Sequence, residues 1–147
     1  MAVLDNQADF SPKLGSPATG VVITGGASGI GLAAAHALAA VGRPVALWDI
    51  NAEGAAGAAN IISERHGVRA VGFSVDLRNP QAVTPAAIAT REAIGPVGGI
   101  VHCAGTAETT GIDGVTPENW DAGIALHVRS IVLMTQAFRE DLRNLPG

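Results

Sequence analysis

The feature that most constrains this chain is a glycine-rich turn at residues 24–31, with the sequence TGGASGIG. It lies between an apolar run and an alanine-rich run, which predicts a strand that turns directly into a helix. Glycine allows both the turn and a close backbone approach to a ligand, and the helix N-terminus offers that ligand unpaired N–H groups. The turn therefore predicts an anion site suited to the pyrophosphate of a dinucleotide. The residues predicted to form it are Gly25, Ser28, Gly29, Ile30 and Gly31.

An acidic residue follows at the distance where dinucleotide sites place one. Asp49 ends the next apolar run, 18 positions after Gly31. A carboxylate there accepts hydrogen bonds from the ribose of the adenosine half. A 2′-phosphate about 4 Å away would be repelled by roughly 4 kcal/mol per unit charge at an effective dielectric constant of about 20. Asp49, with Ile50 beside it, thus predicts NAD in preference to NADP. Glycines also form turns that bind nothing, and this alternative stays open.

Composition excludes several other classes of protein. The 147 residues fit one domain, and 48% of them are hydrophobic, which is enough for a core. A net charge of −4 without a cluster of Lys or Arg predicts no nucleic-acid partner. No run approaches the roughly 18 apolar residues of a membrane span, so no membrane role is predicted. Residues 1–18 are interpreted as a polar leader rather than a signal peptide, because they have no apolar core.

The cysteine and the histidines of this chain predict neither disulfides nor a metal site. Cys103 is the only cysteine, which is typical of a reducing compartment and predicts a cytoplasmic location. The histidines lie far apart along the chain and lack metal-ligand spacing, so no metal is expected. They are His36, His66, His102 and His127.

Strand and helix patterns alternate along the chain after the leader. Strands are predicted at 19–24, 45–49 and 68–75, a fourth strand with its following turn at 98–105, and helices at 28–41, 51–66, 79–95 and 116–143. This alternation predicts an α/β fold with a doubly wound parallel sheet, built from right-handed crossovers. The first and fourth strands should lie side by side, with the ligand crevice above their carboxyl ends.

Helical spacing also predicts which residues face the core. Ser28 is a plausible cap for the first helix, and Pro85 should interrupt the third. The inner face of the first helix is predicted to comprise Ile30, Ala34, Ala37, Leu38 and Val41. The inner face of the last helix is predicted to comprise Trp120, Ile124, His127, Val128, Ile131, Phe138 and Leu142.

The glycine spacing resembles the TGxxxGxG turn of the short-chain dehydrogenase/reductase family more than GxGxxG. The resemblance continues in register through four strands and four helices, and implies a Rossmann-like fold. It implies that Asp76 and Leu77 hold the adenine ring, and that His102, Ala104 and Gly105 contact the nucleotide. Residues 102–105 stand where the family usually has an NNAG motif, and His102 and Cys103 replace both asparagines.

The same resemblance implies hydride transfer between a nicotinamide cofactor and an alcohol or carbonyl compound. The family uses a Tyr-x-x-x-Lys pair for this step, but the chain has no tyrosine, and its one lysine, Lys13, lies in the leader. His127 occupies the position of the family's relay asparagine. It is either a helix histidine that bonds a backbone carbonyl or a residue that assists proton transfer. The chain alone is therefore expected to be inactive.

Three interpretations follow. The first is the NAD-binding half of an oxidoreductase, with residues 19–147 forming a dinucleotide-binding domain that is incomplete at its C-terminal side. The second is a non-catalytic NAD(H)-binding module, and the third is a truncated fragment without a settled function. The resemblance also implies assembly into a homo-oligomer through the helix at 116–143, and a small alcohol or ketone substrate if further chain completes the site.

Overall fold

The computed structural model describes residues 18–107 and 111–144. Almost all of the predicted leader, residues 1–17, lies outside the described residues. The strands are β1 (Gly20–Thr24), β2 (Val45–Asp49), β3 (Ala70–Ser74) and β4 (Val97–His102). The main helices are α2 (Gly29–Ala40), α3 (Ala52–His66), α4 (Pro80–Ile94), α5 (Pro117–Ile124), α6 (Ser130–Ala137) and α7 (Arg139–Arg143). A 3-10 turn (Ile112–Gly114) precedes α5, and a π-helical turn, η2 (Ala125–Arg129), joins α5 to α6.

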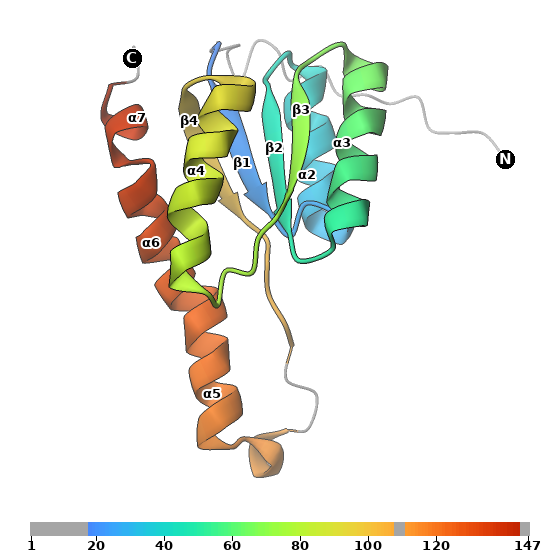
Figure 1. Ribbon diagram of the computed structural model, residues 1–147. Helices are drawn as coiled ribbons and strands as arrows, with labels where there is room; N and C mark the ends of the chain where they lie inside the picture. The colour runs from blue at the N-terminus through green and yellow to red at the C-terminus, as the bar shows by residue number, and fades with distance from the viewer. Residues whose placement is uncertain (1–17, 108–110, 145–147) are drawn as a thin grey trace, which may run out of the picture.

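The four strands form one parallel sheet in the order β3-β2-β1-β4. The first and fourth strands therefore lie side by side, which confirms the predicted doubly wound arrangement. Helices α2 and α3 cover one face of the sheet, while α4 and α6 cover the other (Figure 1). Both edge strands, β3 and β4, are less buried than the two central strands.

Side chains of the central strands alternate between two cores, one on each face of the sheet. Val21, Ile23 and Leu47 pack toward α2 and α3. Val22 and Trp48 pack toward α4 and α6, together with Met134 and Phe138. The indole N–H of Trp48 donates to the Thr90 hydroxyl of α4 at 3.0 Å, which satisfies the one polar atom of this large buried side chain.

The face predicted for the first helix is confirmed only in part, since Val41 is buried and Leu38 packs against the core. The buried residues of α2 are Gly31, Ala35 and Ala39, whereas the Ile30 side chain is 81% exposed. Because α2 consists mostly of small residues, its faces differ little in hydrophobicity. The close approach of its backbone to the glycine-rich turn therefore determines which face is buried. A Cβ on Gly31 would lie 2.2 Å from the Gly25 carbonyl oxygen. Glycine at this position therefore lets the start of α2 pack directly on the preceding turn.

The prediction that Pro85 interrupts the third helix is wrong, because α4 is continuous. Asn79 caps it by accepting a hydrogen bond from the Gln81 N–H at 3.1 Å. Pro85 lies on the exposed side, and the residues that face the core are Val83, Ala87, Thr90 and Ile94. Burial of this face maintains the helix despite the hydrogen bond that proline cannot make.

The inner face predicted for the last helix is largely wrong. Trp120 and Val128 are 62% and 51% exposed, and Ile124, His127 and Ile131 are also exposed. The buried positions of this region are Ala125, Ser130, Met134 and Phe138, so Phe138 is confirmed, while Leu142 is half-buried. Two features explain the error. The π-helical turn shifts the helical register, and α5 extends beyond the sheet, as Figure 1 shows.

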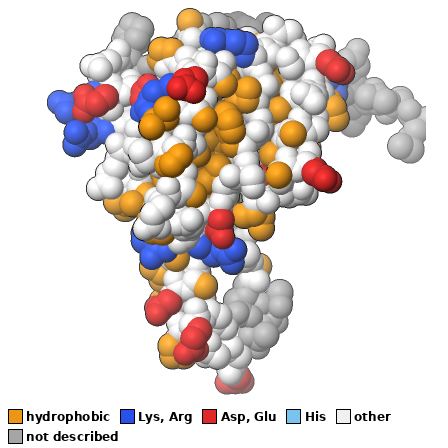
Figure 2. Space-filling model, viewed as in Figure 1, with side chains coloured by type: hydrophobic (Ala, Val, Ile, Leu, Met, Phe, Trp, Pro, Cys, Tyr) orange, Lys and Arg blue, Asp and Glu red, His pale blue; other side chains and the backbone are white. Residues whose placement is uncertain are grey.

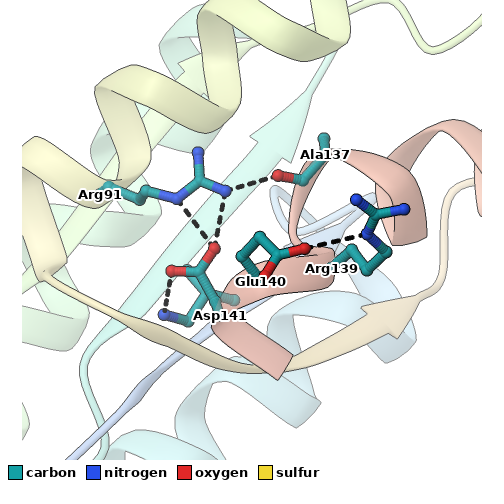
Figure 3. Close-up of polar contacts among 6 residues, drawn as sticks. Arg91, Ala137, Arg139, Glu140 and Asp141 are labelled. Carbon is teal, nitrogen blue, oxygen red and sulfur yellow. Dashed lines mark hydrogen bonds and ion pairs between the residues drawn. The ribbon is translucent and has the colours of Figure 1, made fainter. Parts of the chain in front are cut away.

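An ion pair attaches the C-terminal helices to α4 and to β4 (Figure 3). The Arg91 guanidinium donates to Asp141 Oδ2 at 2.6 and 2.9 Å and to the Ala137 carbonyl. Asp141 Oδ1 accepts from the Val97 N–H at 3.5 Å. The guanidinium also lies 5.0 Å above the Phe138 ring. These contacts fix α6 and α7 against the sheet.

The viewed face of the molecule carries an apolar region. Figure 2 shows hydrophobic side chains gathered over its middle, where α4 and the edge strand β3 lie. Val71, Phe73, Ala89 and Ala93 contribute to a shallow groove of about 610 Å³ there. No helix in the described ranges 18–107 and 111–144 is both long enough and apolar enough to cross a membrane.

Candidate functional site

A cavity of about 540 Å³ opens above the carboxyl ends of the strands, where β1 and β4 meet. Eleven of the twelve residues predicted to bind a cofactor line it. They are Gly25, Ser28, Gly29, Ile30, Gly31, Asp49, Ile50, Asp76, Leu77, Ala104 and Gly105. His102, at the end of β4, is not among the lining residues. Trp48, Val75, Arg78, Cys103, Thr106 and Leu126 also line the cavity and were not predicted.

The glycine-rich turn delivers backbone rather than side chains to the cavity. Gly25 and Gly29 have φ angles of 65° and 54°, in the left-handed region that glycine adopts without strain. A Cβ at Gly25 would lie 2.9 Å from the Ala104 nitrogen, so the turn also packs against the end of β4. A Cβ at Gly29 would meet nothing within 4 Å, because this residue faces open space.

The N-terminus of α2 is open toward the cavity. Ser28 occupies the cap position, but its side chain makes no capping hydrogen bond with any described residue. Its predicted cap position is confirmed, since its extended backbone precedes α2 and its carbonyl accepts the first helical bond, from the Leu32 N–H at 3.1 Å. The amides of the first turn are left for a ligand, and the partial positive charge of the helix favours an anionic one.

Asp49 is held in place at the cavity wall by two backbone amides. Its Oδ2 accepts from the Ala27 N–H at 3.1 Å, and its Oδ1 accepts from the Asn51 N–H at 3.0 Å. The first bond joins the end of β2 to the glycine-rich turn. The carboxylate has lone pairs beyond those used by these two donors, so it can also accept from ribose hydroxyls.

A threonine hydroxyl fixes the turn after β4. Thr24 is 1% exposed, and its Oγ1 accepts from the Cys103 N–H at 3.1 Å and from the Ala104 N–H at 3.0 Å. The end of β1 is thereby bonded to the turn after β4. Backbone that lines the cavity at Cys103 and Ala104 is thus held by a side-chain hydroxyl.

Asp76 carries a charge partner that the sequence analysis did not identify. Its carboxylate accepts from the Arg78 backbone N–H at 3.0 Å and from the Arg78 guanidinium at 2.9 Å through both oxygens. These hydrogen bonds hold the pKa of Asp76 below its usual range and raise that of Arg78. The Arg129 side chain in turn donates to the Arg78 carbonyl at 2.7 Å. An arginine two residues after the acid was the available sequence signal.

His127 lies beside the turn after β4 and not in the main cavity. Its Nε2 is 3.1 Å from the Thr106 carbonyl oxygen and 3.3 Å from the Thr106 nitrogen. A Cβ at Gly105 would lie 2.6 Å from the ring, so glycine makes room for the histidine. His127 also lines a second cavity of about 440 Å³, with Trp120 and Asn119, that shares Thr106 with the first.

Two histidines that are far apart along the chain meet in the fold. His36 of α2 and His66 of α3 are in contact, with His36 Nδ1 3.1 Å from His66 Nε2. Burial, His36 and Arg65 lower the pKa of His66. Periodicity within single helices cannot reveal such a contact, because it depends on how two helices pack.

The residues around the main cavity fit a dinucleotide. Open amides at a helix N-terminus suit a pyrophosphate, Asp49 suits a ribose, and buried Leu77 and Val75 offer an apolar wall to a base. The cavity volume is within the range of ligand sites in proteins, about 300–1,000 Å³. Among the described residues, no catalytic pair of tyrosine and lysine accompanies this site, since the chain has no tyrosine.

Comparisons with known proteins agree with this geometry. The family model described as short chain dehydrogenase matches residues 19–145. The chain is 37% identical over 117 residues to D-threitol dehydrogenase from Mycolicibacterium smegmatis, and 32% identical over 117 residues to 2-(S)-hydroxypropyl-CoM dehydrogenase 3 from Xanthobacter autotrophicus. The matches cover 79% and 80% of this chain but 44% and 46% of those proteins. The chain thus spans about half the length of these curated relatives.

Solved structures give the same result. L-sorbose reductase from Gluconobacter frateurii, complexed with NADPH and L-sorbose, superposes with a TM-score of 0.80 at 29% identity, covering 87% of this chain and 49% of that one. A short chain dehydrogenase from Burkholderia cenocepacia in complex with NADP gives 0.78 at 32% identity, covering 85% and 51%. On its sequence and its fold, this chain belongs to the short-chain dehydrogenase family.

Proposed function

We propose that this chain is the nicotinamide-dinucleotide-binding half of an oxidoreductase that acts on an alcohol or carbonyl compound. The observation that carries the proposal is the cavity above the sheet, where the open amides of α2 and the fixed carboxylate of Asp49 lie on one wall. Residues 19–147 form the binding domain in this proposal, and its C-terminal completion lies outside the sequence. The bound cofactor supplies the hydride-transfer chemistry.

We also propose that NAD is preferred over NADP. The Asp49 carboxylate would repel a 2′-phosphate by roughly 4 kcal/mol per unit charge at about 4 Å, which corresponds to about three decades in affinity before screening. The structures from Gluconobacter frateurii and Burkholderia cenocepacia hold NADPH and NADP, so cofactor choice must be read from this chain's own residues. Arg78, the Lys or Arg residue among the described residues that line the cavity, is already paired with Asp76 and does not offset the charge of Asp49.

The proposed role of His127 is to position the turn after β4. Its ring nitrogen bonds Thr106, and its ring packs against Gly105, so it holds two lining residues of the cavity. The second proposed role, as a proton relay, rests on its place beside the cavity and on the ability of imidazole to accept and donate a proton. Neither role replaces the missing tyrosine, and we expect no turnover from the 147 residues alone.

The exposed helix face supports a proposal of self-association. Apolar side chains recur at intervals of about four residues along α5, η2 and α6, which places them on one helix face. They are Trp120, Ile124, Val128, Ile131 and Val132, each at least 42% exposed. Such a stripe is a typical interaction surface, and a second copy of this chain is the proposed partner.

A cytoplasmic location is proposed because the chain contains a single cysteine.

The test of the proposed function is NADH binding by the 147-residue chain, followed by an assay for oxidation of small secondary alcohols. We expect saturable NADH binding, with energy transfer from Trp48, which lines the cavity, and no turnover. Binding without turnover also fits a non-catalytic NAD(H)-binding module. A longer native chain that restores turnover would favour the oxidoreductase half, whereas an inactive native chain of 147 residues would favour the module. Failure to bind NADH would contradict both.

A further inference from the structure

Two histidines form a contact away from the cofactor cavity. His36 Nδ1 of α2 and His66 Nε2 of α3 are 3.1 Å apart, with the ring centroids 5.3 Å apart and the ring planes at 63°. Both side chains are half-buried, and neither residue lines the cavity above the sheet. The contact joins the two helices that cover the same face of the sheet (Figure 1). The proposed function gives this pair no role.

The separation of the two nitrogen atoms matches that of neighbouring ligands on one metal ion. Imidazole nitrogen binds Zn²⁺ at about 2.0–2.1 Å, so two such ligands lie about 2.9 Å apart at a right angle and about 3.3 Å apart at the tetrahedral angle. The observed distance of 3.1 Å falls between these values. Imidazole suits zinc, copper and nickel, whereas magnesium and calcium select oxygen ligands.

We propose that His36 and His66 form a two-histidine site for a divalent transition-metal cation such as Zn²⁺. Residues 18–107 and 111–144 contain no group of three or more His, Cys, Asp and Glu side chains that could hold a metal. Water therefore completes the coordination, and the affinity is modest. The site is distinct from the dinucleotide cavity and does not depend on the proposed function.

Binding requires a change of tautomer and a rotation of the rings so that both facing lone pairs point at the cation. In the metal-free protein one facing nitrogen carries the hydrogen of an N–H···N bond between the rings. When the cation binds, that proton moves through solvent to the other nitrogen of the same ring. Both facing lone pairs then bind the metal, and no electron and no net proton is exchanged between two neutral imidazoles and solvent.

The position of His66 favours a cation. It is the last residue of α3, where the partial negative charge of the helix C-terminus attracts positive charge. Arg65, in the same turn, opposes this attraction. A bound cation would cross-link α2 to α3 and stabilise the folded state by mass action, since the unfolded chain does not hold the two rings together.

The test is a calorimetric titration of Zn²⁺ into the tag-free 147-residue chain above the ordinary imidazole pKa of about 6.5. We expect one saturable binding event, and ¹⁵N shifts of the ring nitrogens at His36 Nδ1 and His66 Nε2. His36→Gln or His66→Gln should each weaken binding at least tenfold, and the double variant should lose little more. His102→Gln is the matched control and should leave the affinity unchanged, and Mg²⁺ should not bind.

Several results would overturn the proposal. They are no saturable Zn²⁺ binding up to millimolar concentration, unchanged affinity in both single variants, or ring shifts at His102 or His127 in place of the pair. The variants are compared with the unsubstituted chain by circular dichroism without metal. Should either variant fail to fold, the ring shifts of the unsubstituted chain decide the question alone.

Discussion

At the scale of single residues, the two carboxylates of the cavity differ in how their charge is balanced. Asp49 accepts hydrogen bonds from two neutral backbone amides and keeps its negative charge toward the cavity. Asp76 is paired with the Arg78 guanidinium through both oxygens. One carboxylate therefore acts on a nearby phosphate as a full charge, while the other forms part of a neutral pair. Cofactor preference should accordingly depend on Asp49.

Replacing Asp49 by asparagine should change this preference. Asp49→Asn removes the charge with little change in size, so the affinity for NADPH relative to NADH should rise by at least tenfold, a conservative fraction of the three decades estimated for the repulsion. Calorimetric titration of both nucleotides measures the ratio. Asp76→Asn is the matched control and should change the ratio less than threefold. An unchanged ratio in Asp49→Asn would contradict the assignment of specificity to this residue.

The ion pair at Asp76 makes a prediction about pH. Because Arg78 lowers the pKa of Asp76 in the folded state, the folded protein binds its proton less readily than the unfolded chain. The stabilisation is fully present above the unfolded pKa of about 3.9 and is lost as pH falls through the folded value. NMR titration of the Asp76 carboxyl carbon should give a midpoint below the ordinary range, and Arg78→Gln should raise it. Equal midpoints in both proteins would exclude this coupling.

Thr24 should contribute to stability through its hydroxyl. Thr24→Val keeps the shape of the side chain but removes the acceptor for the Cys103 and Ala104 N–H groups. The two donors are partly buried, and leaving buried donors unsatisfied costs about 1–3 kcal/mol, so we expect the free energy of unfolding to fall by about 1 kcal/mol, the lower end of that range. Thr135→Val, at an exposed helix position, is the control and should change it by less than about 0.5 kcal/mol. Similar losses in the two variants in urea unfolding would contradict this role.

At the scale of elements, glycine spacing predicted more than helical periodicity did. The residues of the turn at 24–31 that were predicted from residue type and spacing line the cavity, with Gly25 and Gly29 at positive φ angles. The buried faces of α2 and of the last helix did not follow fully from helical spacing. The faces of alanine-rich α2 differ little in hydrophobicity, and the π-helical turn η2, which no local sequence pattern indicates, shifts the helical register. The contact of His36 with His66 depends on how α2 packs on α3, and this information is absent from either helix alone.

The ion pair between α4 and α7 should be worth more than a surface pair. Its side chains are 34% exposed for Arg91 and 11% for Asp141, whereas those of Arg139 and Glu140 are 66% and 64% exposed. Asp141→Ala should lower the free energy of unfolding by about 1–3 kcal/mol, since the Arg91 guanidinium and the Val97 N–H lose their acceptor. Glu140→Ala should cost less than about 1 kcal/mol. A double-mutant cycle with Arg91→Ala measures the coupling, and a coupling near zero would contradict the anchoring role.

At the scale of the whole molecule, two features of the described residues outside the cavity bear on association with further chain. One is the sheet edge at β4, and the other is the apolar stripe along α5, η2 and α6. The chain covers about half the length of its relatives, so the similarity in sequence and fold extends over one half of each relative. The cavity itself is lined by the turn after β1, the end of β2, the start of α2, the turns after β3 and β4, and Leu126 of η2, all within this half.

If the stripe joins two copies, a charge on it should separate them. Ile124→Glu places a carboxylate among exposed apolar side chains, and the mass measured by light scattering should fall to that of one chain of 14.7 kDa. Ile61→Glu is the matched control, because Ile61 is 58% exposed on α3, away from the stripe, and it should leave the mass unchanged. A single-chain mass for the unsubstituted protein at all concentrations would contradict self-association.

The most direct test of the central claim is the NMR spectrum of the ¹⁵N-labelled chain titrated with NADH. If the cavity above the sheet binds the dinucleotide, the amide signals that move should cluster at residues 25–31, 49–50, 76–78 and 103–106, with the first turn of α2 moving most. Shifts confined to other surfaces, or a spectrum that NADH leaves unchanged at millimolar concentration, would contradict the assignment of this cavity as the cofactor site.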